Sequence, residues 1–186
     1  GLNSMAVLLV LEALDVERDT AIAALGAFEP LAGRGAEMTL PVGGGTFTLI
    51  DESYNANPAS MGAALNVLGQ APTGAHGRRI AVLGDMLELG PTGPELHRNL
   101  NEAVTANRID LVYCCGPLMR NLWDALSTGK RGGYAESSAA LEAQAVAAVR
   151  AGDVIMVKGS LGSKMKRIVS ALEKRFPDKP AHEEAV

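Results

Sequence analysis

The segment "TFTLIDESYNANPASM", Thr46 to Met61, passes from one structural pattern to another within a few residues. The run Thr46 to Ile50 is apolar and typical of a strand. Polar and turn-forming residues follow, and Asn57 with Pro58 then makes a favourable helix start, because Asn caps helix N termini and Pro suits the first helical turn. The segment therefore predicts a strand, a polar turn and a helix, in that order.

The same alternation continues toward the end of the chain. Apolar strands bounded by glycine, with a helix after each, predict an α/β domain with a mostly parallel, doubly wound sheet and helices on both faces. The later strands are expected in 78–85, 110–116, 132–137 and 153–160, and the helices in 58–68, 93–107, 117–127, 138–152 and 162–176.

The residues before Thr46 show a different pattern. We expect an apolar helix over 4–14, a second helix within 15–28 capped by Asp15 or Asp19, and a hairpin whose strands, "AEMTLPV" and "TFTLID", are joined by glycines. The chain begins inside an apolar helix. We therefore expect it to be a piece of a longer protein, with residues 1–4 either native or left from a tag.

Composition excludes several classes of function. Hydrophobic residues make up 47% of the 186 residues and aromatic residues only 4%, so the core must be built from aliphatic side chains. The net charge of −4, without a basic stripe, argues against nucleic-acid binding. The longest apolar run, Met5 to Leu11, is too short for a membrane span. Cys114 and Cys115 are neighbours on a predicted strand, so they point to opposite faces and predict buried thiols in a reducing compartment.

Polar residues follow four of the predicted strands, in "IDESYN", "LGDM", "CCGP" and "VKGS". Ligands of parallel sheets bind beyond the carboxyl ends of the strands, so these four ends predict one polar rim. In the first of them, a helix cap explains Asn57 but not Asp51, Glu52, Tyr54 and Asn55 together.

Other residues admit two interpretations each. Asp85 either caps the next helix or binds a ligand. His97 has no partner motif, and a lone histidine is usually a surface residue or one whose hydrogen bonds are made within the protein. Arg34 is a loop charge or a phosphate contact. Lys158 lies beside a helix start expected near Ser160, which predicts an anion site. Neither G-x-x-x-x-G-K-[ST] nor G-x-G-x-x-G occurs, and no His, Cys and carboxylate cluster has metal-ligand spacing.

Three strings, in this order and at these separations, resemble the carboxyl-terminal part of the Mur ligases. They are "LIDESYNANPASMGAALNVLG" at 49–69, "RRIAVLGDMLELG" at 78–90 and "MVKGSLGSKM" at 156–165. The D-x-x-Y-N-A-N-P and G-D-M-x-E-L-G patterns are typical of the MurF branch. The resemblance covers nearly the whole chain apart from its carboxyl-terminal tail.

The resemblance implies a three-domain enzyme with a UDP-sugar domain, a central ATPase and a Rossmann-like third domain. Residues 1–50 would be the end of the central domain and residues 51–186 the third domain. The sugar-nucleotide domain, the phosphate-binding loop, the magnesium ligands and a carbamylated lysine would lie outside this chain. We therefore expect the chain alone to be inactive.

The implied reaction is ATP-dependent amide ligation in peptidoglycan synthesis, in the cytoplasm, with ATP and Mg²⁺. ATP phosphorylates the carboxylate of a UDP-MurNAc-tripeptide, and the amine of D-Ala-D-Ala then attacks the acyl phosphate. Acyl phosphates hydrolyse readily, so a third domain that closes over the nucleotide would exclude water.

The resemblance also implies nucleotide contacts. Asn3 matches the last residue of an adenine-contacting H-x-x-x-N motif whose His would lie upstream. Arg34 matches the arginine that reaches the terminal phosphates, where its charge would stabilise the transferring phosphoryl group. Asp51 matches the acid near the ribose. Tyr54, Asn55 and Asn57 belong to the family signature, which lies beside the nucleotide.

On the substrate side, the resemblance assigns Asp85, Lys158 and Ser160 to the rim that faces the incoming dipeptide. They are candidates to orient its amine or carboxylate, and Lys158 with helix-start amides would suit a carboxylate. Arg34 and Lys158 are thus the candidate catalytic residues.

Two alternatives stay open. The chain could be a non-catalytic α/β module that binds a nucleotide or a partner, which the upstream sequence would reveal. It could also belong to another Mur-type amide ligase, such as a folylpolyglutamate or cyanophycin-like enzyme, although the Y-N-A-N-P string argues against this.

Overall fold

The computed structural model describes residues 2–26 and 33–178, with side chains described from Met5 onward. The chain divides into two compact units, residues 1–30 and residues 31–186. We had expected a division near residue 50. That position lies inside a strand of the second unit, whose backbone pairing ties residues 45–52 to the sheet.

The first unit consists of α1 (Leu2–Ala13) and α2 (Arg18–Gly26), as expected. The predicted caps of α2 were wrong. The Glu17 carboxylate accepts a hydrogen bond from the backbone N–H of Thr20 at 2.9 Å, whereas Asp15 has a left-handed backbone and lies in the turn before it. The apolar side chains of α1 are largely exposed, among them Met5, Val7, Leu9 and Val10.

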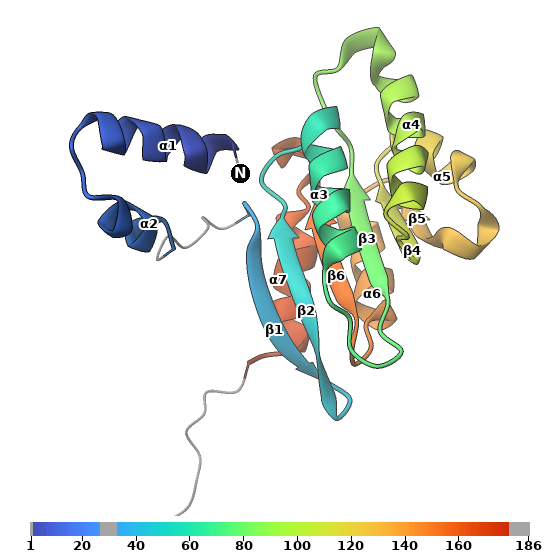
Figure 1. The fold of residues 1–186 in the computed structure, drawn as a ribbon. Helices are drawn as coiled ribbons and strands as arrows, with labels where there is room; N and C mark the ends of the chain where they lie inside the picture. Colours follow the sequence, from blue (N-terminus) through green and yellow to red (C-terminus); the bar gives the residue numbers. More distant parts are fainter. Residues whose placement is uncertain (1, 27–32, 179–186) are drawn as a thin grey trace, which may run out of the picture. The chain divides into compact units, whose positions relative to one another are not determined.

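The second unit is built on one six-stranded sheet in the order β1-β2-β6-β3-β4-β5 (Figure 1). β1 and β2 form the predicted antiparallel hairpin, which turns at Gly43 and Gly44, both with positive φ. All other neighbours are parallel, which confirms the predicted mostly parallel α/β sheet. The strands are β1 (Ala36–Val42), β2 (Gly45–Glu52), β3 (Arg79–Gly84), β4 (Leu111–Cys115), β5 (Arg131–Ala135) and β6 (Val154–Lys158).

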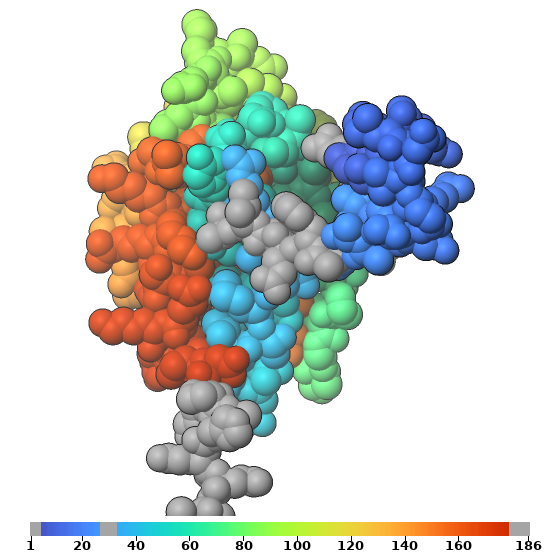
Figure 2. Space-filling model, turned by 90° about the vertical axis from the view of Figure 1, so that its left-hand side faces the viewer, coloured from blue at the N-terminus to red at the C-terminus, as the bar shows by residue number. Residues whose placement is uncertain are grey.

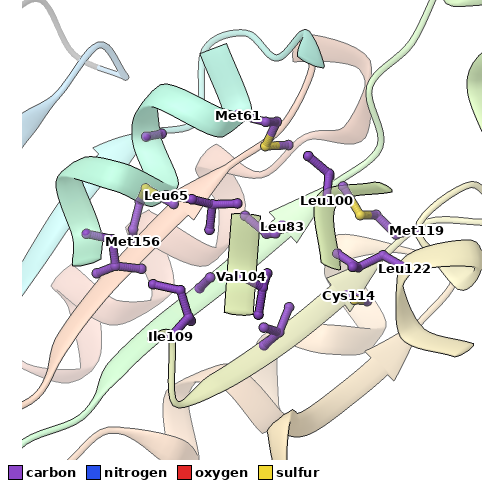
Figure 3. Close-up of a cluster of buried hydrophobic side chains, with 14 of the residues drawn as sticks. Met61, Leu65, Leu83, Leu100, Val104, Ile109, Cys114, Met119, Leu122 and Met156 are labelled. Carbon is purple, nitrogen blue, oxygen red and sulfur yellow. The ribbon is translucent and has the colours of Figure 1, made fainter. Parts of the chain in front are cut away.

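Helices cover both faces of this sheet, as predicted. The helices α3 (Pro58–Gln70), α4 (Gly93–Ala106) and α5 (Arg120–Ala125) pack on one face, and α6 (Ser138–Ala148) and α7 (Lys166–Arg175) on the other. Figure 3 shows the first core, where Met61 and Leu65 of α3 and Leu100 and Val104 of α4 meet sheet residues such as Leu83.

The second core is closed partly by the hairpin. Figure 2 shows α7 beside the β1–β2 hairpin on the face turned to the viewer. Phe47 of β2 meets Phe176, just after α7, edge to face, with ring centroids 5.3 Å apart. Both cysteines are buried and free, Cys114 in the first core and Cys115 in the second, so neighbouring positions face opposite sides of the sheet. Burial raises the pKa of the Cys115 thiol to about 11.

One predicted helix start was wrong. The chain after β6 forms a short 3₁₀ turn, η3 (Leu161–Ser163), and α7 begins only at Lys166. Lys164, with φ of 54°, adopts a left-handed backbone between the two, which interrupts helical continuation. No helix among the described residues combines the length and the apolar character needed to cross a membrane.

Candidate functional site

The predicted polar rim exists at the carboxyl ends of four adjacent strands. Glu52 of β2 pairs in register with Lys158 of β6, which lies beside Leu83 of β3, and Gly84 pairs with Cys115 of β4. The chain leaves β2 and β3 toward α3 and α4 on one face, and leaves β6 toward α7 on the other. Ligands of doubly wound sheets bind outside the carboxyl ends of the strands at such a divergence, and we call this place the crevice.

Asp51 is the most connected side chain of the rim. It is 1% exposed and accepts four hydrogen bonds. Its Oδ1 accepts from the N–H and the hydroxyl of Ser53, at 3.1 and 2.6 Å. Its Oδ2 accepts from the N–H of Gly33 at 3.1 Å and from the ammonium of Lys166 at 2.9 Å. A carboxylate offers about four acceptor positions, and these four donors account for them.

The charge of Asp51 is set by two opposing effects. Burial favours the neutral acid and raises its pKa, but the hydrogen bonds from Ser53 and Lys166 favour the carboxylate, and their sum holds the pKa below the usual value. Asp51 is therefore ionised at neutral pH and acts as an anchor for the loops around it.

Arg34 is presented by a loop that these contacts hold. The N–H of Gly35 donates to the backbone carbonyl of Asp51 at 2.8 Å, and the N–H of Tyr54 donates to the carbonyl of Gly33 at 3.2 Å. Gly33 approaches Tyr54 so closely that an added Cβ would lie 2.9 Å from the Tyr54 Cβ. The guanidinium of Arg34 lies over the Tyr54 ring, 4.4 Å from its centroid. The structure thus joins Arg34, Asp51 and Tyr54, which the resemblance had grouped.

The two asparagines of the signature make different hydrogen bonds. Asn57 caps α3, where its Oδ1 accepts from the N–H of Ser60 at 2.8 Å and its own N–H donates to the Ser60 hydroxyl at 3.0 Å, a capping box. Asn55 accepts from the N–H of Ala56 through its side chain. The cap thus accounts for the Asn57 side-chain oxygen, and Asn55 is exposed at the rim.

Lys158 is buried at the end of β6, with its side chain 3% exposed. Its ammonium donates to Glu52 at 3.1 Å and to the backbone carbonyl of Asn55 at 3.0 Å. The expected pairing with helix-start amides is not found, because α7 begins at Lys166. Lys158 instead joins the end of β6 to the β2–α3 loop.

Ser160 connects three loops. Its hydroxyl donates to the carbonyl of Ala56 at 3.3 Å and accepts from the N–H of Leu87 at 2.9 Å, and its own N–H donates to the carbonyl of Asp85 at 3.0 Å. The loops after β2, β3 and β6 therefore meet at this buried residue.

Asp85 is turned inward rather than toward the rim. It is 4% exposed and accepts from the N–H of Met119 at 2.8 Å and from that of Leu118 at 3.3 Å. Burial raises its pKa, although these amides oppose the shift. A Cβ on Gly116 would lie 2.4 Å from its carboxyl carbon, so the glycine leaves room for this contact. Asp85 thus does not cap the next helix, α4, as one interpretation expected, but fixes the loop before α5.

His97 has the internally satisfied role that a lone histidine suggests. It is fully buried, its Nε2 accepts from the N–H of Met86 at 2.9 Å, and its Nδ1 bonds the carbonyl of Gly93 at 2.6 Å. Nε2 must be unprotonated to accept that N–H, so Nδ1 is the donor.

Sequence reasoning missed Ser53 and Lys166. Ser53 lies within the quoted signature, two residues from the acid it bonds, and an Asp with Ser two positions later is a signal for such a turn. Lys166 had no comparable signal, because its contact with Asp51 spans 115 residues. Asn3 was also predicted as a site residue, and its side chain lies outside the described residues.

Two further features bear on ligands. No group of three or more His, Cys, Asp or Glu in residues 2–26 and 33–178 is arranged to share a metal ion, so no described residue is assigned to Mg²⁺. An open groove of about 1320 Å³ lies at the opposite end of the sheet, between the hairpin turn and the helices α6 and α7. None of the candidate site residues lines this groove.

Comparison with known proteins agrees with this architecture. A model of the family "Mur ligase, glutamate ligase domain" matches residues 38–161. The chain is 36% identical over 126 residues to the UDP-N-acetylmuramoyl-tripeptide–D-alanyl-D-alanine ligase of Escherichia coli K12, covering 67% of this chain and 26% of that protein. It is 34% identical over 132 residues to the ligase of the same name from Treponema pallidum, covering 69% and 28%.

Solved structures show the same fold. The MurF ligase of Thermotoga maritima, determined in complex with ADP, superposes with a TM-score of 0.73 at 24% identity and covers 90% of this chain. A MurF structure from Acinetobacter baumannii gives a TM-score of 0.75 at 23% identity over 92% of this chain. The aligned parts are 36% and 37% of those two chains, so this chain spans little more than a third of their length.

Proposed function

Because the chain belongs to the Mur ligase family through its glutamate ligase domain, we propose that it is the carboxyl-terminal part of an ATP-dependent peptide ligase. The reaction would join D-alanyl-D-alanine to a UDP-N-acetylmuramoyl-tripeptide, the activity in the names of its curated relatives. The whole protein would thereby supply a peptidoglycan precursor in the cytoplasm, and so act in cell-wall growth, cell shape and division.

The domain assignment follows the compact units. We propose that residues 1–30 complete a central ATP-binding domain and that residues 31–186 form the third domain of the ligase. The apolar side chains exposed on α1 support this proposal, because a core helix with uncovered apolar residues needs further chain to bury them. ATP and Mg²⁺ would be held largely by residues outside this chain.

In the proposed reaction, a carboxylate oxygen of the tripeptide attacks the γ-phosphorus of ATP and ADP leaves. The dipeptide amine then attacks the acyl carbon of the acyl phosphate and loses a proton, and the tetrahedral intermediate expels phosphate. Charge gathers on the transferring phosphoryl oxygens, so a positive group fixed in advance beside them lowers the barrier.

Residues of this chain would lie beside both the nucleotide and the dipeptide. Arg34 would contact the terminal phosphates, and Tyr54 with Asn55 would line the nucleotide side of the crevice. Lys158, buried and donating to Glu52 and to the Asn55 carbonyl, and Ser160 would hold the loops facing the dipeptide. Asp85 would stabilise that face by accepting hydrogen bonds from the loop before α5.

The observation that carries the proposal is the family match over residues 38–161, which includes the loops after β2, β3, β4 and β6 that form the rim. The test is to express the product of the complete reading frame and to follow phosphate release with ATP, the tripeptide nucleotide and D-Ala-D-Ala. We expect release that requires both substrates and an amide product identified by its mass.

The 186-residue chain assayed in parallel is expected to show neither ATP hydrolysis nor amide formation. Turnover by that chain would contradict the proposal that the reaction needs residues outside it. A complete product that binds nucleotide but forms no amide would favour the non-catalytic module, and an amide with another amine would favour a different Mur-type ligase.

A further inference from the structure

A backbone N–H next to Arg34 and the ammonium of Lys166 converge on one carboxylate oxygen, although they come from distant parts of the sequence. Asp51 Oδ2 accepts from the N–H of Gly33 at 3.1 Å and from the Lys166 ammonium at 2.9 Å. Atoms bonded to the same oxygen at these distances lie no more than 6.0 Å apart. The Lys166 ammonium therefore lies next to the backbone that carries Arg34.

The two cations approach the crevice from different sides. Arg34 belongs to the loop that precedes β1, whereas Lys166 is the first residue of α7, on the face of the sheet opposite α3. This is the point where β2 and β6 direct the chain to opposite faces. A ligand entering the crevice there would meet both side chains.

Both cations are accessible, while the acid that holds Lys166 is not. The Lys166 side chain is 50% exposed and that of Asp51 is 1% exposed. An ammonium has three N–H donors, and Asp51 is the one described partner of Lys166. Arg34 is exposed and lies over Tyr54, a contact with a ring face that leaves the guanidinium edge to solvent.

The charges around the crevice leave a positive excess. Asp51 balances one of the two cations, and Glu52 with Lys158 forms a separate ion pair. Lys164, exposed on the preceding loop, adds another positive charge. An anion with several oxygens, such as a terminal phosphate, suits this arrangement because each cation can donate to a different oxygen.

Resting on the proposed function, we propose that Lys166 is a second phosphate-binding residue, and that Asp51 is the positioning residue which holds Lys166 beside Arg34. The two cations bind the terminal phosphate of the nucleotide together. Asp51 touches neither the nucleotide nor the reacting atoms and acts through the residues it anchors. This role differs from a ribose contact.

The test uses inorganic triphosphate and the 186-residue chain, with the dissociation constant measured by NMR titration at low ionic strength. We expect saturable binding that shifts the amides of Gly33, Gly35 and Lys166. Lys166→Gln is expected to weaken binding about fivefold or more, and Lys166→Arg, which keeps the charge, to stay within about twofold of the unsubstituted chain.

The matched control is Lys174→Gln, which removes the same charge from the same helix. It lies eight residues further along α7, about 12 Å down the helix axis, and is expected to change the constant by less than about twofold. Equal effects of Lys166→Gln and Lys174→Gln would overturn the proposal. So would shifts confined to residues around Lys174, or no saturable binding by the unsubstituted chain.

A second measurement separates this proposal from the proposed function. In the product of the complete reading frame, Lys166→Gln is expected to raise the KM for ATP about fivefold or more, without a change of that size in the KM for D-Ala-D-Ala. Ligase activity with an unchanged KM for ATP would overturn the role of Lys166 alone. Triphosphate binding through Lys166 without any ligase activity would overturn the proposed function and leave the anion site standing.

Discussion

At the scale of single residues, the signature after β2 illustrates what the sequence can reveal. Its spacing located Asp51, Tyr54 and Asn57 at the rim, because a polar turn between a strand and a capped helix has few alternatives. It could not reveal that the Asp51 carboxylate is saturated by Gly33, Ser53 and Lys166, since two of these donors lie 18 and 115 residues away in the chain. The same limit applies to Asp85, whose partners Leu118 and Met119 follow another strand.

Replacing Arg34 by Ala in the complete enzyme is expected to lower kcat by roughly 10²-fold or more, because one fixed donor to the developing charge is lost. Arg34 is exposed, so the substitution should leave the unfolding midpoint nearly unchanged. Steady-state kinetics with both substrates saturating measures the effect. Arg167→Ala, which breaks an exposed pair with Glu142, is the control and should retain full activity. An Arg34→Ala enzyme with unchanged kcat would remove Arg34 from the chemistry.

The two buried acids predict opposite pH dependences of stability. Asp51 has a folded pKa below its unfolded value of about 3.8, so its carboxylate stabilises the fold above that value, and this contribution is lost as pH falls through the folded pKa. Asp85 has a raised folded pKa, so its contribution is fully present below the unfolded value and is lost as pH rises through the folded pKa.

Urea unfolding of Asp51→Asn and Asp85→Asn chains between pH 3 and pH 7 tests these signs. The stability difference from the unsubstituted chain should shrink on acidification for Asp51→Asn and grow for Asp85→Asn. Asp124→Asn, in an exposed ion pair, is the surface control. Parallel pH profiles for the two buried acids would contradict the assignment of burial as the dominant effect at Asp85 and of hydrogen bonding as the dominant effect at Asp51.

At the scale of elements, strands and helices were predictable wherever one sequence period persisted. The hairpin, the five parallel-paired strands and the helices on both faces all followed from apolar runs and glycine boundaries. The start of α7 was not predictable in this way, because Lys164 takes a left-handed backbone that no sequence rule assigns to lysine. Close packing between loops decides that region, and it depends on residues from three strand ends.

Glycines at the ends of β3 and β6 make this packing possible. A Cβ on Gly159 would lie 2.5 Å from the Ser163 hydroxyl, 2.6 Å from Met165 and 3.0 Å from the Cα of Gly84. Gly159→Ala is therefore expected to lower the free energy of unfolding by about 1–3 kcal/mol through overpacking. Urea unfolding of the purified chain measures the loss.

Gly62 within α3 is the matched control, because an added Cβ there meets no atom within 4 Å. Gly62→Ala should raise the stability of the same chain by about 0.5–1 kcal/mol, since alanine loses less backbone entropy in a helix. Changes of opposite sign in the free energy of unfolding at the two glycines would support the packing argument. An unchanged free energy of unfolding in Gly159→Ala would show that the loop after β6 adjusts to the added methyl group without loss of stability.

At the scale of the whole molecule, the sequence predicts two parts that divide near residue 50, whereas the compact units of the chain divide before the hairpin. The resemblance assigns the hairpin largely to the first part, whereas its second strand pairs with β6 from Thr48 to Glu52. Partner choice between strands depends on contacts more than 100 residues apart, which a local pattern does not contain. A border drawn from cores rather than from patterns falls between residues 30 and 31.

This border predicts how the chain behaves when it is divided. The second unit has a buried core on each face of its sheet, so a chain of residues 31–186 is expected to unfold cooperatively, with a urea midpoint close to that of the 186-residue chain. The first unit has two helices of 12 and 9 residues with exposed apolar side chains. Helices this short are marginal in water, so residues 1–30 alone should show little helix by circular dichroism. A peptide of residues 1–30 that folds by itself, or a shortened chain without a cooperative transition, would show that the division is wrong.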